Sequence, residues 1–257
     1  MKIKRFLTLI DTKAKMSLKA ESSKLYLSFL WWILEPLLMV LIFYFVFAVL
    51  LKSGQRDFVI FLMCAKIPFL WFSKSVTIAS GSIVADKSIV SNIDIPKTIF
   101  PYTAIQISLY KEAPVFILLL LLSMAYGYAP SFDWLLLIPL IILEYVIIVF
   151  FSLLCALLVC YVDDVRMLIN MTMMALMFVS GIFFDVSSIN SSMAHYVIEL
   201  NPIAFFCDGF RSILMGTKHF DVNIYFTYLA IFSVGVLFMH FVYLKSSRAI
   251  AAKVINS

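Results

Sequence analysis

One stretch of this chain restricts its possible folds more than any other. Residues 135–159 read LLLIPLIILEYVIIVFFSLLCALLV, an apolar run interrupted by a single carboxylate, Glu144. About 20 such residues are enough for a helix to cross the hydrocarbon core of a bilayer. The whole chain is 63% hydrophobic and 14% charged, whereas a soluble domain is about half apolar and about a quarter charged. The sequence therefore predicts an integral membrane protein.

Six segments are apolar and long enough to predict membrane-spanning helices. They cover about residues 29–51, 58–80, 103–127, 134–160, 168–185 and 224–244. The second is the least regular, because Lys66, Pro68 and Lys74 interrupt it. The predicted fold class is all-α, with one transmembrane domain of six helices over residues 1–257.

Basic residues predict the orientation, because cytoplasmic loops carry an excess of lysine and arginine. With the N-terminus inside, thirteen of the twenty basic residues fall on the cytoplasmic side. The opposite side then holds only Lys52, Arg56, Arg211 and Lys218. Both termini are therefore expected in the cytoplasm.

The N-terminal residues, 1–27, have a helical period with one apolar and one basic face. The apolar face holds Ile3, Phe6, Leu7, Ile10, Ala14 and Leu18. A basic amphipathic helix lies in the membrane interface, where anionic lipids attract it. The alternative is a simple positively charged tag that only fixes the orientation.

The first span opens with FLWWILEP, residues 29–36, which places a carboxylate and a proline near its start. Trp31 and Trp32 are typical of the headgroup level, so Glu35 lies only about one helical turn deeper. There it can reach headgroups, water or a basic partner such as a lysine of the N-terminal helix. Pro36 falls where a lost hydrogen bond is least damaging. We expect Glu35 and Pro36 to form a hinge and anchor that contributes to gating.

Two cytoplasmic loops are candidates for contact with a partner. In residues 82–96, Ile83, Ile89, Val90 and Ile93 alternate with Asp86, Lys87 and Asn92, which predicts a short amphipathic helix. Such a helix suits docking into a groove of a cytoplasmic protein, or it lies on lipid. The loop YVDDVRML carries Asp163, Asp164 and Arg166, which either contact a partner or cap a helix hairpin.

The longest segment on the outer side, residues 186–222, contains two half-length apolar pieces, MAHYVIEL and IAFFCDGFRSILM. Asn201 and Pro202 join them. Each piece is too short to span, so both are predicted to be re-entrant or interfacial helices covered by protein or by a water-filled cavity. They would form a lid or vestibule, and an ordinary amphipathic surface loop is the alternative.

Catalytic motifs are missing from the sequence. No glycine is followed by lysine, so the chain has no P-loop and cannot hydrolyse ATP by that mechanism. The histidines and cysteines lack metal-ligand spacing, and there is no GxSxG turn. We therefore predict no catalytic residue, no metal site and no cofactor in this chain.

Charged residues within the predicted spans are functional candidates, because each is costly in a membrane. They are Lys66, Lys74, Lys111, Glu112, Glu144 and Asp185. Lys111 and Glu112 are adjacent, so they point in different directions and are expected to pair with other spans. Glu144 is the best candidate for a proton relay.

Aromatic residues of the first and fifth spans suggest a channel. Their rings can support sugar rings without reading a sequence of sugars, although aromatic residues more often face lipid or pack between helices. On the first span a single stripe holds Trp32, Pro36, Met39, Phe43 and Phe47. The remaining predicted channel residues are Tyr44, Phe178, Phe183 and Phe184.

The order of these features resembles a known family. The pieces are LWWILEP, IPKTIFP, DVR and LNPIAFFCDGFR, found in that order after a basic amphipathic helix. The chain looks like the permease subunit of ABC-2 type exporters that move polysaccharide, the O-antigen, capsule and teichoic acid group. The resemblance covers essentially the whole chain. It departs at Tyr26-Leu27-Ser28, where many members have Leu-Gly, which implies a less flexible start of the first span.

The resemblance implies a homodimer in the bacterial cytoplasmic membrane, paired with two copies of a separate P-loop ATPase that binds ATP and Mg²⁺. Residues 86–95 would form the coupling helix on the ATPase, with 163–166 as a second contact. Residues 193–200 and 203–215 would be outer gating helices, including Asn201, Pro202 and Arg211. The first and fifth spans would line a channel for lipid-linked polysaccharide.

Two other functions fit parts of the sequence. An exporter of a drug, lipid or small molecule from the same superfamily would also have six spans. A proton-coupled secondary carrier would use Glu144 and the intramembrane lysines. Against the carrier, the two halves show no inverted repeat, and the loop at 82–102 would have no purpose.

Overall fold

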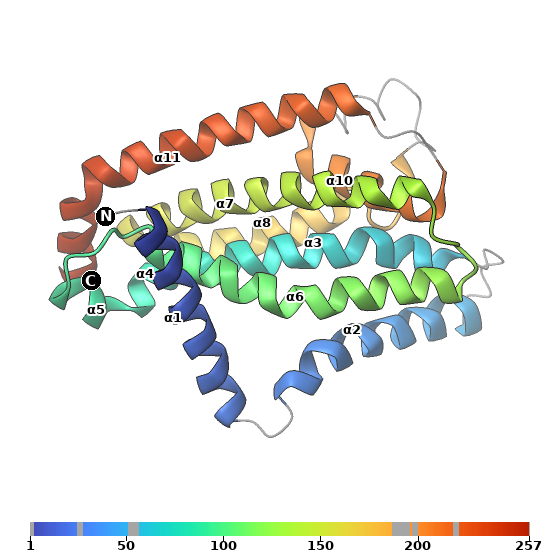
Figure 1. Ribbon diagram of the computed structural model, residues 1–257, viewed down its shortest axis with the longest axis horizontal. Helices are drawn as coiled ribbons and strands as arrows, with labels where there is room; N and C mark the ends of the chain where they lie inside the picture. The colour runs from blue at the N-terminus through green and yellow to red at the C-terminus, as the bar shows by residue number, and fades with distance from the viewer. Residues whose placement is uncertain are drawn as a thin grey trace.

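The computed structural model describes residues 3–24, 28–50, 57–186, 196, 200–217 and 221–256. In these ranges the chain is helical, with connecting turns and no strand, so the predicted all-α class is confirmed for them. The elements shown in Figure 1 are α1 (Ile3–Lys24), α2 (Ser28–Tyr44), η1 (Phe45–Leu50), α3 (Phe58–Ser80), α4 (Ser82–Ala85), α5 (Lys87–Asn92), α6 (Ile99–Ala125), η2 (Phe132–Leu136), α7 (Leu137–Tyr161), α8 (Val165–Val179), α10 (Pro202–Met215) and α11 (Val222–Asn256).

Among the described residues, four helical segments are long and apolar enough to cross a membrane, namely α3, α6, η2 with α7, and α11. The shortest, α3, has 23 residues, or about 34 Å of helix against a hydrocarbon core of about 30 Å. They correspond to the predicted spans at 58–80, 103–127, 134–160 and 224–244. α11 continues well past the last of these, to Asn256.

The other two predicted spans form shorter helices. α2 has 17 residues and runs directly into the π-helical η1. α8 has 15 residues, only about 22 Å, which is less than the hydrocarbon thickness. The predicted segment 168–185 was wrong in its extent, because the helix ends at Val179. Gly181 follows with a φ of +72°, a left-handed conformation typical of helix ends.

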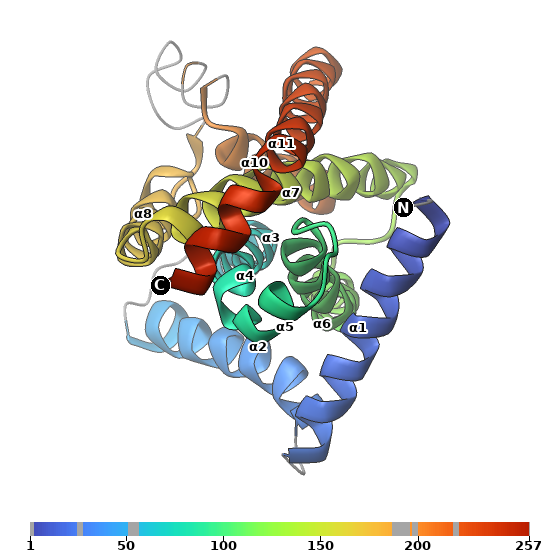
Figure 2. The ribbon, with the colours of Figure 1, turned by 90° about the vertical axis from the view of Figure 1, so that its left-hand side faces the viewer.

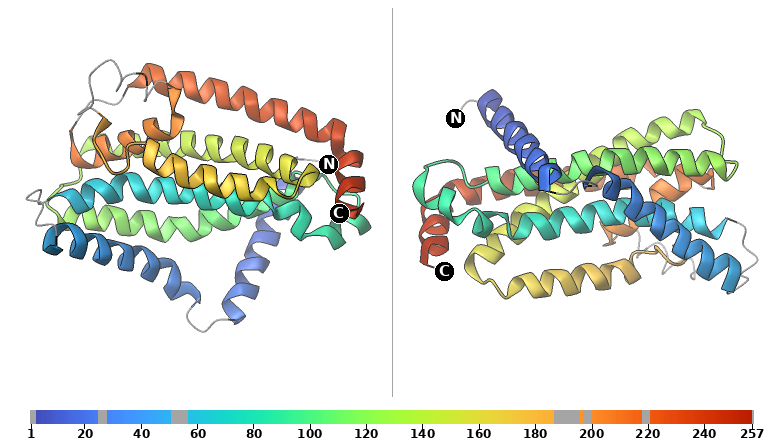
Figure 3. Two further views of the ribbon diagram at one scale, coloured as in Figure 1. Left: turned by 180° about the vertical axis from the view of Figure 1, so that it is seen from behind. Right: turned by 90° about the horizontal axis from the view of Figure 1, so that it is seen from below.

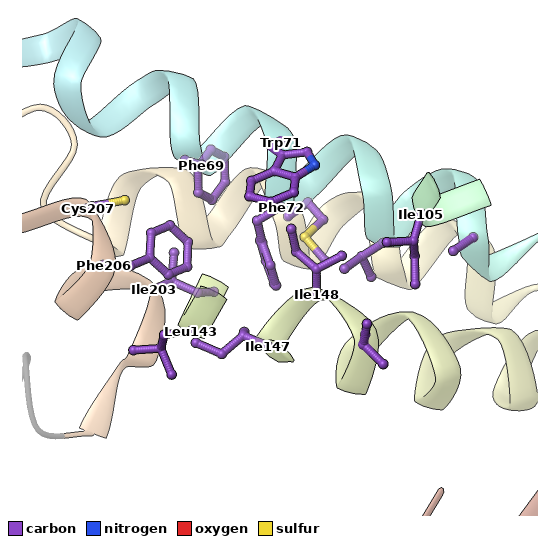
Figure 4. Close-up of a cluster of buried hydrophobic side chains, with 14 of the residues drawn as sticks. Phe69, Trp71, Phe72, Ile105, Leu143, Ile147, Ile148, Ile203, Phe206 and Cys207 are labelled. Carbon is purple, nitrogen blue, oxygen red and sulfur yellow. The ribbon is translucent and has the colours of Figure 1, made fainter. Parts of the chain in front are cut away.

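α3 is the central helix of the bundle. In the most apolar 18-residue stretch of α3, 78% of the residues are buried inside the protein. The corresponding share is 50% for η2–α7, 28% for α6 and 22% for α11. Figure 4 shows Phe69, Trp71 and Phe72 on α3 beside residues of α7 and α10, among them Phe206 of α10. The Phe72 ring lies 5.7 Å from the Phe151 ring and 6.1 Å from the Phe206 ring. Because α3 meets protein on most sides, it tolerates the lysines and the proline that made this span the least regular in the sequence.

Both chain ends lie at the same end of the bundle as α4 and α5 (Figure 1). α10 lies toward the opposite end, where α2 and α6 also finish. α1 does not join the bundle; it crosses it at a steep angle and packs along the outside of α6 (Figures 2 and 3). We refer to the two ends as the terminal end and the α10 end. That the terminal end is cytoplasmic remains a prediction.

Candidate functional site

The predicted docking segment, residues 82–96, folds as two short helices and a loop. α4 and α5 meet at Asp86, so residues 82–96 do not form one continuous helix, and α5 lies within the range 86–95 expected for the coupling helix. Ile83 and Val90 are buried against the bundle, and Ile89 packs partly against it. The exposed side chains of this segment include three of the predicted coupling residues, Lys87, Asn92 and Ile93. Ile93 is 52% exposed, which leaves an apolar group available to a partner.

Asp86, another predicted coupling residue, binds within the chain. Its carboxylate accepts a hydrogen bond from the Lys13 ammonium of α1. The same ammonium lies 4.5 Å above the Phe100 ring at the start of α6. Asp86 thus joins the docking segment to the N-terminal helix. The sequence offered no signal for this pair, because Lys13 is one of seven basic residues in that region.

The second predicted contact, at 163–166, lies directly beside the first. Arg166 pairs with Asp163, with 3.2 Å between the guanidinium and carboxylate atoms. The guanidinium also covers Gly81, where an added Cβ would be 3.2 Å from the Arg166 Cζ. The hairpin between α7 and α8 therefore contacts the junction of α3 and α4. We define the terminal-end surface by five of the exposed residues in the two contacts, namely Lys87, Asn92, Ile93, Asp163 and Asp164.

α1 is held to α6 by buried apolar side chains and by two polar links. Ile10 and Ala14 of the predicted apolar face are buried, whereas Leu7 is exposed. Asp11 accepts hydrogen bonds from Lys15 and from the Tyr110 hydroxyl of α6. These bonds, the one from Lys15 first, hold the pKa of the Asp11 carboxyl below its ordinary value, so it stays ionised at neutral pH.

The second link joins the far end of α1 to α6. The Lys111 ammonium donates to both carboxylate oxygens of Glu21 at 2.7 Å. It also lies 5.6 Å from the centre of the Trp32 ring on α2. The sequence predicted a partner for Lys111 on another span; the partner is instead in the N-terminal helix.

Glu35 of the FLWWILEP motif pairs with Lys74 of α3, at 2.6 Å. A basic partner was one of the alternatives expected for Glu35; it is Lys74, from the interrupted second span, and not a lysine of the N-terminal helix, which was the example given. Both side chains are about half exposed. Pro36 lies inside α2, which continues as helix to Tyr44. The hinge role of these residues remains a prediction.

A cavity of about 100 Å³ lies between α2, α3 and α6. Trp32, Glu35, Pro36 and Met39 line it from α2, so part of the predicted aromatic stripe faces the bundle of its own chain. Its basic lining residues are Lys66, Lys74 and Lys111. Lys66 is 7% exposed, and its ammonium lies 4.6 Å from the Phe43 ring and 5.8 Å from the Phe183 ring. The first and fifth predicted spans therefore meet around one lysine.

Lys66 has two aromatic contacts but no ion pair within the part of the chain that the structure describes. A lysine in the middle of a membrane helix costs about 3 kcal/mol on insertion scales. A desolvated contact with an aromatic face returns about 2 kcal/mol, so the two ring contacts together offset a cost of this size. Neither ring supplies a negative charge to neutralise the ammonium.

The remaining predicted channel residues lie in different environments. Phe178 is exposed and stacks on Phe183 with 5.5 Å between ring centres, and Phe184 is half-buried. Tyr44 is exposed. The Phe47 side chain lies outside the described residues. A single chain thus gives no continuous aromatic wall from these described residues, and their channel role remains a prediction.

At the α10 end, the second predicted half-helix, residues 203–215, is confirmed as a helix by α10. Asn201 caps it: its side-chain oxygen accepts from the backbone N–H of Ile203 at 3.0 Å, and its amide donates to the Ser180 hydroxyl at 3.1 Å. Pro202 occupies the first turn, where no backbone donor is needed. Of the first piece, residues 193–200, only Tyr196 and Leu200 are among the described residues.

Arg211, a predicted gating residue, is a buried clamp. It is 3% exposed, and its guanidinium donates to three backbone carbonyls, of Phe61 at 3.2 Å, Gly181 at 3.0 Å and Ile182 at 3.1 Å. Its guanidinium carbon lies 3.6 Å from the centre of the Phe61 ring. One side chain therefore ties α10 to the start of α3 and to the turn after α8.

Glu144, the predicted relay residue, is 0% exposed on α7. Neither of its carboxylate oxygens has a hydrogen-bond partner within the described part of the chain. A relay needs a neighbouring group to pass the proton on, and the structure supplies no hydrogen-bonded chain from this carboxyl among those residues.

Comparison with known protein families identifies the family to which this chain belongs. The family described as ABC-2 type transporter matches residues 16–215, which include both docking loops, the lysine-lined cavity and α10. The chain belongs to the ABC-2 type transporter family. Because its described part contains four apolar helices of spanning length, it is a multi-pass membrane protein of that family.

Individual proteins resemble this ABC-2 chain at low identity but over most of its length. One O-antigen export system permease protein RfbA from Klebsiella pneumoniae is 24% identical over 234 residues, covering 90% of this chain and 89% of that protein. A second protein of the same name and organism is 24% identical over 81% of this chain and 80% of its own length. A protein of that name from Myxococcus xanthus is 22% identical over 80% of this chain and 79% of its own.

Proposed function

We propose that this ABC-2 chain is the membrane subunit of an exporter that moves lipid-linked polysaccharide, of the O-antigen or capsular type, across the bacterial cytoplasmic membrane. The proposal is carried by the terminal-end surface, where two loops far apart in sequence present exposed polar and apolar groups together. Such a surface suits a cytoplasmic partner. The three relatives named as O-antigen export permeases support polysaccharide as the cargo.

In this proposal two copies of the chain pair with two copies of a separate P-loop ATPase, which binds ATP and Mg²⁺. Each copy crosses the membrane six times, with α2–η1 and α8 completing the spans and both termini in the cytoplasm. α2, η1, α8 and the turn after α8 line the channel with Trp32, Met39, Phe43, Phe47, Phe178 and Phe183. The chain itself catalyses no reaction.

The contacts at the terminal end suggest how hydrolysis is coupled to transport. A displacement of α4 and α5 would reach α1 through the Lys13–Asp86 pair. It would reach α3 and the α7–α8 hairpin through the contact of Arg166 with Gly81. The N-terminal helix and the central helix would therefore respond together to the ATPase.

Deletion and complementation test the proposal. We expect a strain that lacks the gene to lose its surface polysaccharide and a plasmid copy to restore it. Ile93→Asp should abolish restoration while membrane levels of the chain stay normal, because Ile93 is exposed and its charge would oppose an apolar docking contact. The matched control is Thr12→Asp, an exposed position on α1 outside the surface.

Two results would count against the proposal. Unchanged surface polysaccharide in the deletion strain, with altered resistance to a drug instead, would favour a small-molecule exporter. Recovery of the purified chain without any P-loop ATPase from cells that express both genes would remove the basis for coupling at the terminal end.

A further inference from the structure

The cavity between α2, α3 and α6 is lined by three lysines, one of which has no carboxylate partner among the described residues. Two of its three lysines are neutralised, Lys74 by Glu35 at 2.6 Å and Lys111 by Glu21 at 2.7 Å. The third, Lys66, has the Phe43 and Phe183 rings as cation–π partners, and its ammonium forms no ion pair or hydrogen bond within the described residues.

Lys66 lies well inside the membrane-spanning helix α3, where a charge without a counter-charge is costly. It lies 14 residues before Ser80, where α3 ends, so its Cα is about 21 Å from the terminal end of the helix. Glu112 is the other carboxylate in the lining, and the charges that act on it are those of Lys74 and Glu35. Lys66 is therefore a nearly buried ammonium, deep in the bundle, beside a cavity and without a carboxylate next to it in the described chain.

We infer that this cavity binds the phosphate of a lipid phosphate or diphosphate, with the Lys66 ammonium as its principal charge partner. This inference rests on the proposed function, because the carrier end of a lipid-linked polysaccharide is the substrate part with that chemistry. The cavity, of about 100 Å³, has room for a phosphate group beside Lys66. The Ser108 hydroxyl, which accepts from Ser75 at 2.7 Å, offers a hydrogen-bonding group at the wall.

The rest of the lining favours a lipid over a free anion. Its apolar residues are Met39, Met63, Ile67, Leu70, Ile78, Ile107 and Val115. An apolar lining of this kind stabilises the hydrocarbon chain next to the phosphate, whereas a free diphosphate has no apolar part that would gain from it. Charge-assisted hydrogen bonds from an ammonium to phosphate are strong in such surroundings. Lys74 and Glu35 are about half exposed and weakly coupled, so an arriving phosphate can compete for Lys74.

A binding experiment on the full-length chain in lipid nanodiscs tests the inference. The probe is radiolabelled farnesyl diphosphate, with farnesol and inorganic diphosphate as competitors. We expect farnesyl diphosphate to bind and each competitor to displace it at least about tenfold less effectively than unlabelled farnesyl diphosphate, because each lacks one half of the recognition. Equal displacement by inorganic diphosphate would overturn the lipid assignment, and equal displacement by farnesol would overturn the phosphate assignment.

Variants of Lys66 identify the site. Lys66→Gln should weaken binding about tenfold, the loss expected for one charge-assisted hydrogen bond, and Lys66→Arg should restore most of it. The matched control is Lys245→Gln on α11, which also removes an ammonium from an aromatic ring, Phe241 at 4.9 Å, but far from the cavity. Thermal unfolding of each variant separates lost binding from lost folding. Wild-type affinity in Lys66→Gln, or no binding by the wild-type chain, would overturn the inference.

The failure of this inference is distinguishable from a failure of the proposed function. If the plasmid copy restores surface polysaccharide but Lys66→Gln neither weakens binding nor reduces export, the exporter stands and the phosphate site falls. If the deletion strain keeps its polysaccharide, the proposed function falls whatever the binding data show.

Discussion

The two ends of the bundle are held together in different ways. At the terminal end the ion pairs are partly exposed: Lys13–Asp86 joins α1 to the docking segment, and Asp163–Arg166 is a local pair within the α7–α8 hairpin. Pairs of this kind contribute about 0–1 kcal/mol each, so they can open and re-form. At the α10 end, the buried Arg211 donates to backbone carbonyls of two other segments. Removing such a buried charged partner costs about 3–5 kcal/mol. The comparison indicates that the terminal end adapts while α3 and α10 move as one body.

The largest effect is expected at the buried clamp. Arg211→Met leaves the carbonyls of Phe61, Gly181 and Ile182 without their donor, which should destabilise the chain by about 3 kcal/mol or more. Denaturant unfolding of the purified protein in micelles measures this change. The control is Arg166→Met, whose exposed pair should cost less than about 1 kcal/mol. Equal losses in the two variants would remove the contrast between the two ends.

A smaller effect is expected at the turn that supplies two of those carbonyls. Gly181 has a φ of +72°, and an added Cβ would lie 2.5 Å from the Val186 Cγ2 atom. Gly181→Ala should therefore destabilise the protein by about 2–3 kcal/mol, since strain and overlap act together. Gly127→Ala is a matched control, because Gly127 also has a positive φ but nothing within 4 Å. We expect about 1 kcal/mol there, and a larger loss at Gly127 would contradict the role of the Val186 contact.

Charge exchange at the terminal end should change transport more than stability. Asp86→Lys alone places two ammonium groups together and should reduce export several-fold, because it separates α1 from the docking segment. Adding Lys13→Asp restores opposite charges and should recover most of the export. Unfolding free energy should change by only about 1 kcal/mol throughout. A double variant as defective as the single one would show that Asp86 acts on the partner and not on Lys13.

The smallest effect is expected for Glu35→Gln, which removes a half-exposed pair with Lys74. Its unfolding free energy should fall by about 0.5 kcal/mol. Export is the more informative measurement, because Glu35 borders the lysine-lined cavity. A loss of 2 kcal/mol or more would place this pair with the buried clamp instead of with the adaptable contacts.

The sequence predicted the parts of the fold that depend on hydropathy. The four long spans follow from apolar runs, and the caps Asn201 and Pro202 mark the start of α10. α8 was predicted too long because FVSGIFF is apolar throughout, although the left-handed Gly181 ends the helix. Ion pairs between segments could not be predicted, because the sequence contains several carboxylates that could pair with Lys13, Lys74 or Lys111. The burial of α3 was also hidden, because its lysines lower the hydropathy that would otherwise mark it as the central helix.

Hydrogen–deuterium exchange of the permease–ATPase complex, with and without a trapped ATP analogue, tests the central claim most directly. The account predicts that nucleotide changes exchange in α1, α4 and α5, the segments joined by the Lys13–Asp86 pair. Exchange in α10 should stay slow and unchanged, because Arg211 keeps it fixed to α3. Changed exchange in α10 with constant exchange in α4 and α5 would contradict the account.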